Sequence, residues 1–170
     1  MVAKAGLVVL DSNVFIIDLR YPRDRNYRAN RSFLARLPAI APAATTLVNL
    51  LEVCGVLSFN LKEQQVRELY HYLPERYQVS VLPPPTLPAS LPAFPVERLL
   101  SLMTKKLSFG DALVLAAIEA WIPRAACFVS WDARHFRAKT ALPVKTPREF
   151  LEEIDRGEPH GRERSRAGEP

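Results

Sequence analysis

Four acidic residues lie in stretches of sequence that are too apolar for ordinary surface acids: Asp11, Glu52, Asp111 and Asp132. Burying a carboxylate without a partner costs several kcal/mol or raises its pKa until the group is neutral. Such side chains therefore need a cation, a polar crevice or both around them. Whether the four acids can share one site depends on the helices and strands that carry them.

Two of the acids follow apolar runs that are typical of buried strands. Residues 7–10 form a compact apolar run, and it is followed by Asp11, Ser12 and Asn13, which are all good helix-capping types. Asp132 likewise ends the apolar run over residues 127–131. Each of the two acids has an ordinary alternative role as a turn former or helix cap.

The other two acids belong to apolar helices. Glu52 is the only charged residue between Thr45 and Phe59, so we expect a helix that is mostly buried all round, although Glu52 could also pair with an arginine. Asp111 stands three residues after Ser108, at the predicted first turn of another apolar helix. The Ser-x-x-Asp pattern is a capping box, and that structural role is its more common use.

Short apolar runs alternate with amphipathic helical runs along the chain, which indicates an α/β domain with a parallel sheet. Strands are expected over residues 7–10, 77–82, 127–131 and 142–145, and helices around 31–37, 45–59, 61–73, 96–105, 108–121 and 147–154. Six prolines within residues 83–95 predict an extended surface loop. We expect one domain over residues 1–155 and a disordered polar tail over residues 156–170.

In the expected parallel sheet, the four acids can lie close together at one edge. Strand ends of an open parallel sheet lie on the same carboxyl edge, where ligand sites form. Two acids at strand ends, one at a helix start and one within an apolar helix can converge there.

The composition fits a single globular domain. Of the 170 residues, 48% are hydrophobic and 24% are charged, which excludes collagen-like, coiled-coil and wholly disordered chains. We expect no membrane segment, because no apolar run reaches about 18 residues. The apolar stretch that ends at Asp11 is too short for a signal peptide, so a cytoplasmic location is expected. Cys54 and Cys127 lie far apart in apolar runs and are expected to be core thiols.

The net charge of +5 is concentrated near the N-terminus. The segment from Asp18 to Leu37 contains six arginines and two aspartates, so it accounts for four of the five net positive charges. Arginines with interleaved tyrosines could contact phosphates and stack on bases, or they could form a solvated face or a docking surface for a partner. The candidate nucleic-acid-binding residues are Arg20, Arg23, Arg25 and Arg28.

Several short motifs share an order and spacing that resemble PIN-domain nucleases, and among them the VapC-type toxins of toxin–antitoxin pairs. The resemblance covers roughly residues 7 to 151. It rests on Leu10-Asp11-Ser12-Asn13-Val14, on Thr46 to Gly55 with Glu52 three residues before Gly55, on Leu107 to Ala112, on Val129 to Asp132 followed by His135-Phe136, and on Val144 to Pro147 with Phe150-Leu151. The arginine-rich segment, the proline loop and the polar tail depart from the family pattern.

This resemblance implies a PIN-like three-layer α/β fold with a central parallel sheet flanked by helices. It also implies that Asp11, Glu52, Asp111 and Asp132 bind metal and make the chain a divalent-metal-dependent endoribonuclease that hydrolyses RNA. The implied partners are a second copy of the chain, forming a homodimer, and a VapB-like antitoxin. A site of carboxylate oxygens, without a converging Cys or His, suits Mg²⁺ or Mn²⁺ better than Zn²⁺.

Three residues with short polar side chains are expected next to the four carboxylates: Ser12, Asn13 and Ser130. They could fix the carboxylates or touch phosphate. Turn formation and helix capping are equally good explanations for them.

Three other functions compete with this interpretation. A phosphoacceptor receiver domain is disfavoured, because it needs adjacent acids after the first strand and Glu52 lies inside a predicted helix. A non-catalytic RNA- or protein-binding module of the same fold is disfavoured, because all four acids are present. A PIN nuclease that acts on DNA fits the same acid pattern.

Overall fold

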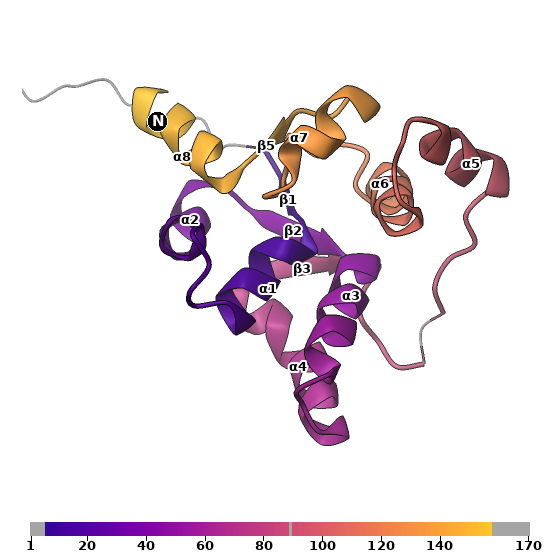
Figure 1. The fold of residues 1–170 in the computed structure, drawn as a ribbon, viewed down its shortest axis with the longest axis horizontal. Helices are drawn as coiled ribbons and strands as arrows, with labels where there is room; N and C mark the ends of the chain where they lie inside the picture. Colours follow the sequence, from indigo (N-terminus) through magenta and orange to yellow (C-terminus); the bar gives the residue numbers. More distant parts are fainter. Residues whose placement is uncertain (1–5, 89, 158–170) are drawn as a thin grey trace, which may run out of the picture.

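The computed structural model describes residues 6–88 and 90–157, and in this part of the chain five strands form one sheet (Figure 1). All neighbouring strands are parallel, in the order β3-β2-β1-β4-β5. The strands are β1 (Val8–Leu10), β2 (Ala43–Thr46), β3 (Val79–Leu82), β4 (Cys127–Val129) and β5 (Val144–Lys145). The expected α/β fold with a central parallel sheet is therefore confirmed.

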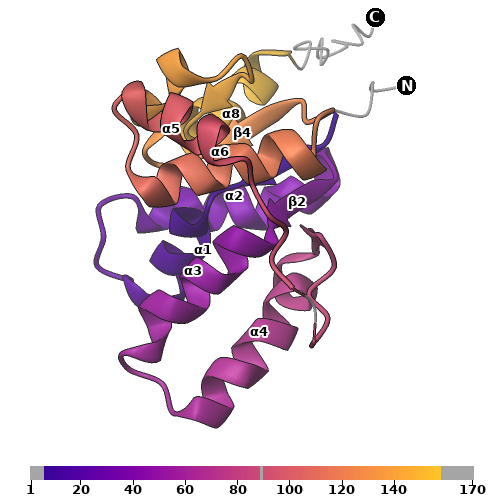
Figure 2. The same ribbon diagram turned by 90° about the vertical axis from the view of Figure 1, so that its right-hand side faces the viewer.

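Helices cover both faces of the sheet and make a three-layer structure, as Figure 2 shows for α5 and α6 on one side and α1, α3 and α4 on the other. One layer contains α1 (Ser12–Arg20), α2 (Tyr27–Ile40), α3 (Leu47–Ser58), α4 (Glu63–Tyr77) and α8 (Pro147–Gly157). The other contains α5 (Val96–Thr104), α6 (Phe109–Trp121), α7 (Ala133–Phe136) and the 3-10 turn η1 (Arg137–Lys139).

The central strand β1 has apolar side chains on both faces of the sheet, so both faces must be covered by helices. Val8 and Leu10 belong to the core beneath the first layer, whereas Val9 belongs to the core beneath the second. All three side chains are buried, because successive residues of a strand point to opposite faces. A continuous apolar run is therefore required, and the sequence has one here.

Several elements differ from the expectation. Tyr77, which was expected to begin a strand, ends helix α4, and β3 begins at Val79. Strand β2 was not expected, because residues 38–44 were expected to connect two helices and Thr45 and Thr46 to begin the helix over residues 45–59. Its small residues are fully buried between β1 and β3, where the sheet is covered on both faces. Helix α2 begins at Tyr27 rather than near Arg31, so Arg28 lies in its first turn.

The remaining expectations concern the loop, the tail and the cysteines. The described part of the 83–95 segment contains no helix or strand, in agreement with its prolines. Arg156 and Gly157 are helical rather than part of a tail, because α8 runs to Gly157; residues 158–170 lie outside the described residues. Cys54 and Cys127 are buried and unpaired, as expected, and burial raises the pKa of each thiol to about 11.

No helix in the described part of the chain has the length and apolar character needed to cross a membrane. The cytoplasmic location stays a prediction.

Candidate active site

The candidate site lies at the carboxyl edge of the sheet, between β1 and β4. The chain leaves β1 toward β2 on one side and returns at β4 on the other, so this crevice is the switch point where open α/β sheets bind ligands. Asp11 directly follows β1, and the segment from Ser130 to Asp132 directly follows β4. The fold therefore places two of the predicted acids at neighbouring strand ends.

Asp11 is the most enclosed of the four acids, with only 5% of its surface exposed. Its Oδ2 atom accepts a hydrogen bond of 2.6 Å from the Ser130 hydroxyl. Its Oδ1 atom accepts from the Asn49 amide at 3.1 Å and from the backbone N–H of Ser12 at 2.8 Å. Asp11 is also the N-cap residue of α1, so its alternative role as a helix cap is realised.

The surroundings of Asp11 raise the pKa of its carboxyl from the ordinary 3.8 to about 7. Desolvation by burial is the largest cause, and the negative charges of Glu52 and Asp132 add to it. The hydrogen bonds from Ser130 and from the Ser12 backbone act in the opposite direction and lower the pKa. The result is a carboxyl group that changes its protonation state near neutral pH.

Glu52 reaches the site from α3 through one short contact. The Ser12 hydroxyl donates a hydrogen bond of 2.7 Å to its Oε2 atom. The expectation of a helix buried all round was wrong, because Leu51, Glu52 and Gly55 lie on an exposed face of α3. No arginine pairs with Glu52 within the described residues, so the alternative of a simple ion pair is not realised there.

Asp132 lies on the other side of Asp11 and is exposed. The Asn13 amide donates to its Oδ2 atom at 3.2 Å and to the Ser130 hydroxyl oxygen at 3.0 Å. The Asn13 carbonyl oxygen accepts from the backbone N–H of Trp131 at 3.1 Å. The Asp132 side chain does not cap α7. Asn13 thus connects the start of α1 to the loop after β4.

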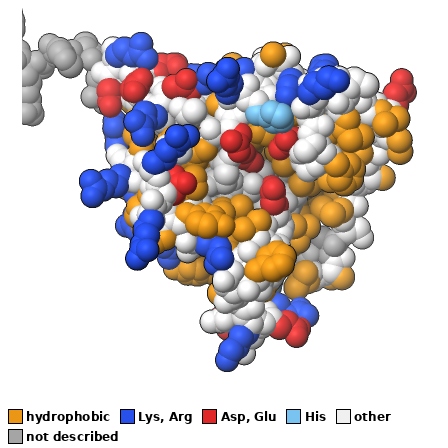
Figure 3. Space-filling model, in the orientation of Figure 1, with side chains coloured by type: hydrophobic (Ala, Val, Ile, Leu, Met, Phe, Trp, Pro, Cys, Tyr) orange, Lys and Arg blue, Asp and Glu red, His pale blue; other side chains and the backbone are white. Residues whose placement is uncertain are grey.

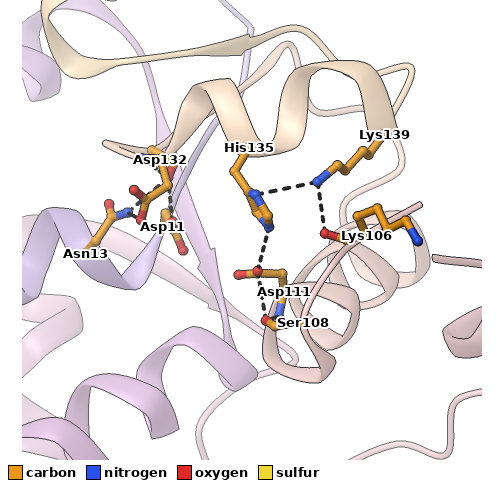
Figure 4. Close-up of polar contacts among 9 residues, drawn as sticks. Asp11, Asn13, Lys106, Ser108, Asp111, Asp132, His135 and Lys139 are labelled. Atoms are coloured by element: carbon orange, nitrogen blue, oxygen red, sulfur yellow. Dashed lines mark hydrogen bonds and ion pairs between the residues drawn. The ribbon is translucent and has the colours of Figure 1, made fainter. Parts of the chain in front are cut away.

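Asp111 faces this group from the start of α6, but it has its own partners (Figure 4). Its Oδ2 atom lies 3.1 Å from Nε2 of His135 and accepts a 2.8 Å hydrogen bond from the Ser108 hydroxyl. The Ser108 hydroxyl oxygen also accepts from the backbone N–H of Asp111, so the serine half of the capping box forms. The expectation that no histidine converges on the site was wrong, because α7 brings His135 to Asp111.

The structure therefore groups Asp11, Glu52 and Asp132, and holds Asp111 opposite them. Figure 3 shows the acidic side chains gathered in the middle of one face, next to a histidine. Among residues 6–88 and 90–157, no three His, Cys, Asp or Glu side chains are arranged as a ready set of metal ligands. The donor chemistry fits a hard divalent cation, since carboxylate oxygens are its preferred ligands, but Asp111 would have to turn from His135 to join it.

The sequence interpretation missed two residues of this site. Asn49 is fully buried and lies one helical turn before Glu52 on α3, so a polar residue at this spacing in an apolar helix could have signalled it. His135 was noted only as part of a motif, and its contact with Asp111 joins two elements that are distant in the sequence, α6 and α7.

The four arginines predicted to contact nucleic acid lie around the turn between α1 and α2. Arg23, Arg25 and Arg28 are exposed, and in the described part of the chain none of them pairs with an acid. The Arg20 guanidinium lies 5.6 Å from the centre of the Tyr21 ring. Nucleic-acid binding by these residues stays a prediction.

Several solved structures contain chains that resemble this one in fold. VapBC-1 from nontypeable Haemophilus influenzae has a TM-score of 0.53 at 16% identity over 83% of this chain and 98% of that chain. FitAcB from Neisseria gonorrhoeae has a TM-score of 0.54 at 14% identity, with 82% and 97% covered. The chain has the PIN-like fold. A toxin–antitoxin complex from Klebsiella pneumoniae, at 21% identity and a TM-score of 0.50 over 82% and 97%, shares this PIN-like fold.

No protein-family model and no curated protein sequence matches the chain. The expected resemblance to VapC-type toxins is thus confirmed at the level of the PIN-like fold.

Proposed function

We propose that this protein is a divalent-metal-dependent endoribonuclease and the toxin of a toxin–antitoxin pair. The observation that carries the proposal is the state of Asp11: a buried carboxyl at the switch point, with a pKa raised to about 7 and two further acids beside it. A carboxylate cluster of this kind is costly for a fold, and a doubly charged cation would relieve its repulsion.

Asp11 would hold the cation, with Glu52, Asp132 and Asp111 completing its ligands directly or through water. A bound Mg²⁺ or Mn²⁺ supplies a water of lowered pKa and offsets charge on the attacking and leaving oxygens of a phosphodiester. Ser130 and Asn49 hold the Asp11 carboxylate in one orientation. The exposed carboxylates are open to solvent and can accept a hydrogen bond from the attacking water.

The comparisons support a VapB-like antitoxin as the partner, since the solved structures that share the fold include VapBC-1 and a toxin–antitoxin complex from Klebsiella pneumoniae. We also propose a homodimer. Val96, Leu100 and Phe109 are large apolar side chains that are more than half exposed, and they lie on α5 and at the start of α6. Light scattering on the purified chain should give the mass of two copies.

The proposed activity is tested by cleavage of single-stranded RNA with Mg²⁺ or Mn²⁺. We expect cleavage by the wild-type protein, none in the presence of EDTA, and a loss of about a hundredfold or more in Asp11→Asn and in Asp111→Asn. Calorimetric titration with Mn²⁺ in the absence of RNA provides a second measurement, in which Asp11→Asn should show no binding.

Glu152→Gln is the matched control. Glu152 is an exposed acid on α8, away from the strand ends that carry the site, so this variant should cleave RNA as the wild type does. Unchanged cleavage in both aspartate variants would refute the proposed site. Cleavage of DNA but not of RNA under the same conditions would show that the substrate is DNA.

A further inference from the structure

A hollow of about 410 Å³ adjoins the carboxylate group and shares Asp132 with it. Its other lining residues belong to the loop after β4, to α7 and to η1. Its lining combines one large aromatic side chain with basic groups: Trp131, Asp132, Arg134, His135, Ala138 and Lys139. No role in the proposed cleavage has been given to Trp131, Arg134 or Lys139.

Two basic side chains line this hollow, Arg134 and Lys139. Arg134 is exposed, and it pairs with no acid in the described part of the chain. The Lys139 ammonium donates to the backbone carbonyl of Lys106 at 3.1 Å and lies 3.5 Å from Nδ1 of His135, which leaves donor capacity for a further acceptor. Figure 3 shows basic side chains on both sides of the histidine that borders the acidic group.

The aromatic side chain that lines the hollow, Trp131, is hydrogen-bonded to a buried residue. The Trp131 indole N–H donates a 2.8 Å hydrogen bond to the side-chain oxygen of Asn30. Asn30 is fully buried, and its amide donates to the backbone carbonyl of Val14 at 2.8 Å. The Trp131 ring on the apolar side of the hollow is therefore held by a hydrogen bond to a buried residue, and the opposite side is basic.

The charge arrangement indicates what would occupy such a hollow. A nucleic-acid strand carries one negative charge per phosphate. The carboxylates of the site therefore repel the phosphates on either side of the scissile phosphate. Cations placed beside the carboxylates offset that repulsion, and a strand crossing the acids at Asp132 would next meet Arg134 and Lys139.

We infer that Arg134 and Lys139 bind the backbone phosphate that neighbours the scissile one in a single-stranded RNA, with Trp131 as the apolar wall of this nucleotide subsite. The inference rests on the proposed function and assigns part of its substrate binding to α7 and η1. Phosphate contacts fix the position of the strand and carry no sequence information.

The test measures binding without cleavage. A fluorescein-labelled, single-stranded oligouridylate is titrated with the wild-type protein in EDTA, and fluorescence anisotropy gives the affinity at several KCl concentrations. The Arg134→Ala/Lys139→Ala variant should bind more weakly, and its slope of log affinity against log salt should be less steep by about 1.4, or about 0.7 for each lost contact to a single strand. Arg134→Lys, which keeps the charge, should retain the wild-type slope.

Arg124→Ala is the control. Arg124 is an exposed arginine in the loop before β4, at the opposite edge of the sheet, so its loss should leave the slope unchanged. A wild-type slope in the double variant, or an equal reduction in Arg124→Ala, would overturn the inference.

The two proposals fail in different ways. If the wild-type protein cleaves RNA and the double variant binds with the wild-type slope, only the subsite is refuted. If the wild-type protein cleaves no RNA, the proposed function is refuted, and the anisotropy measurement still decides whether α7 and η1 bind the strand.

Discussion

The Ser130 hydroxyl, just after β4, donates a 2.6 Å hydrogen bond to the Asp11 carboxylate, just after β1. These residues are 119 positions apart in the chain, and the parallel pairing of β1 with β4 brings them together. The bond stabilises the charged form of a carboxyl that burial would otherwise keep neutral. The protonation state of the site therefore depends on how these two strand ends meet.

Replacing Ser130 by alanine should move the pH dependence of cation binding. Without the hydroxyl, the pKa of Asp11 rises further above 7, because the bond that lowers it is gone. The midpoint of Mn²⁺ binding should shift upward by about one pH unit, as expected for a hydrogen bond to a charged group that contributes about 1.5 kcal/mol. Calorimetric titration with Mn²⁺ between pH 6 and 9 measures this shift. Ser130→Thr keeps the hydroxyl and should keep the wild-type midpoint; equal midpoints in all three proteins would contradict the role of this bond.

The raised pKa of Asp11 also predicts how stability depends on pH. Below the unfolded pKa of 3.8 the carboxyl is neutral in both states, and it imposes no penalty on the fold. As the pH rises toward 7 the unfolded chain ionises first, so the free energy of unfolding falls, by up to about 4 kcal/mol in total. Urea unfolding of the wild type and of Asp11→Asn in EDTA should show this fall in the wild type alone. Parallel pH profiles for the two proteins would show that Asp11 titrates normally.

Much of the fold could be predicted from the sequence, because a sheet covered on both faces needs continuous apolar strands. The apolar runs over residues 7–10 and 127–131 satisfied that need, and they contain the neighbouring strands β1 and β4, although β4 already ends at Val129. Strand β2 satisfies it with alanine and threonine, which have no such signature in the sequence. Strand β2 forms because it pairs with β1 and β3, and this pairing depends on residues that are distant in the sequence.

The candidate site was predictable in its residue types but only partly in its geometry. Acids in apolar surroundings pointed to Asp11 and Asp132, whose strands fix where they lie. The apolar sequence of α3 could not show that one face remains open around Glu52, because the exposed face depends on which neighbours pack against it. The contact between Asp111 and His135 joins the start of α6 to α7, and it has no local sequence pattern.

The contact of His135 with Asp111 should compete with cation binding. A cation that uses Asp111 must displace the imidazole N–H from the carboxylate, so His135→Ala should bind Mn²⁺ about fivefold more tightly, as expected for one net hydrogen bond of about 1 kcal/mol. Calorimetry at pH 8 measures the affinity. His71→Ala, which changes an exposed histidine on α4, should bind as the wild type does. Weaker binding in His135→Ala would instead show that the histidine supports the cation site.

Asn30 should be important for stability although it lies outside the carboxylate group. It is fully buried, and it joins the Val14 carbonyl of α1 to the Trp131 indole after β4. Asn30→Ala leaves both groups without their partner and should lower the free energy of unfolding by about 2 kcal/mol. Urea unfolding followed by circular dichroism measures the loss. The exposed Asn60, in the turn before α4, provides the comparison, and Asn60→Ala should change stability by less than about 0.5 kcal/mol. Equal stabilities for the two variants would mean that the Trp131 indole and the Val14 carbonyl find other partners, and that the wall of the hollow beside α7 is not fixed through Asn30.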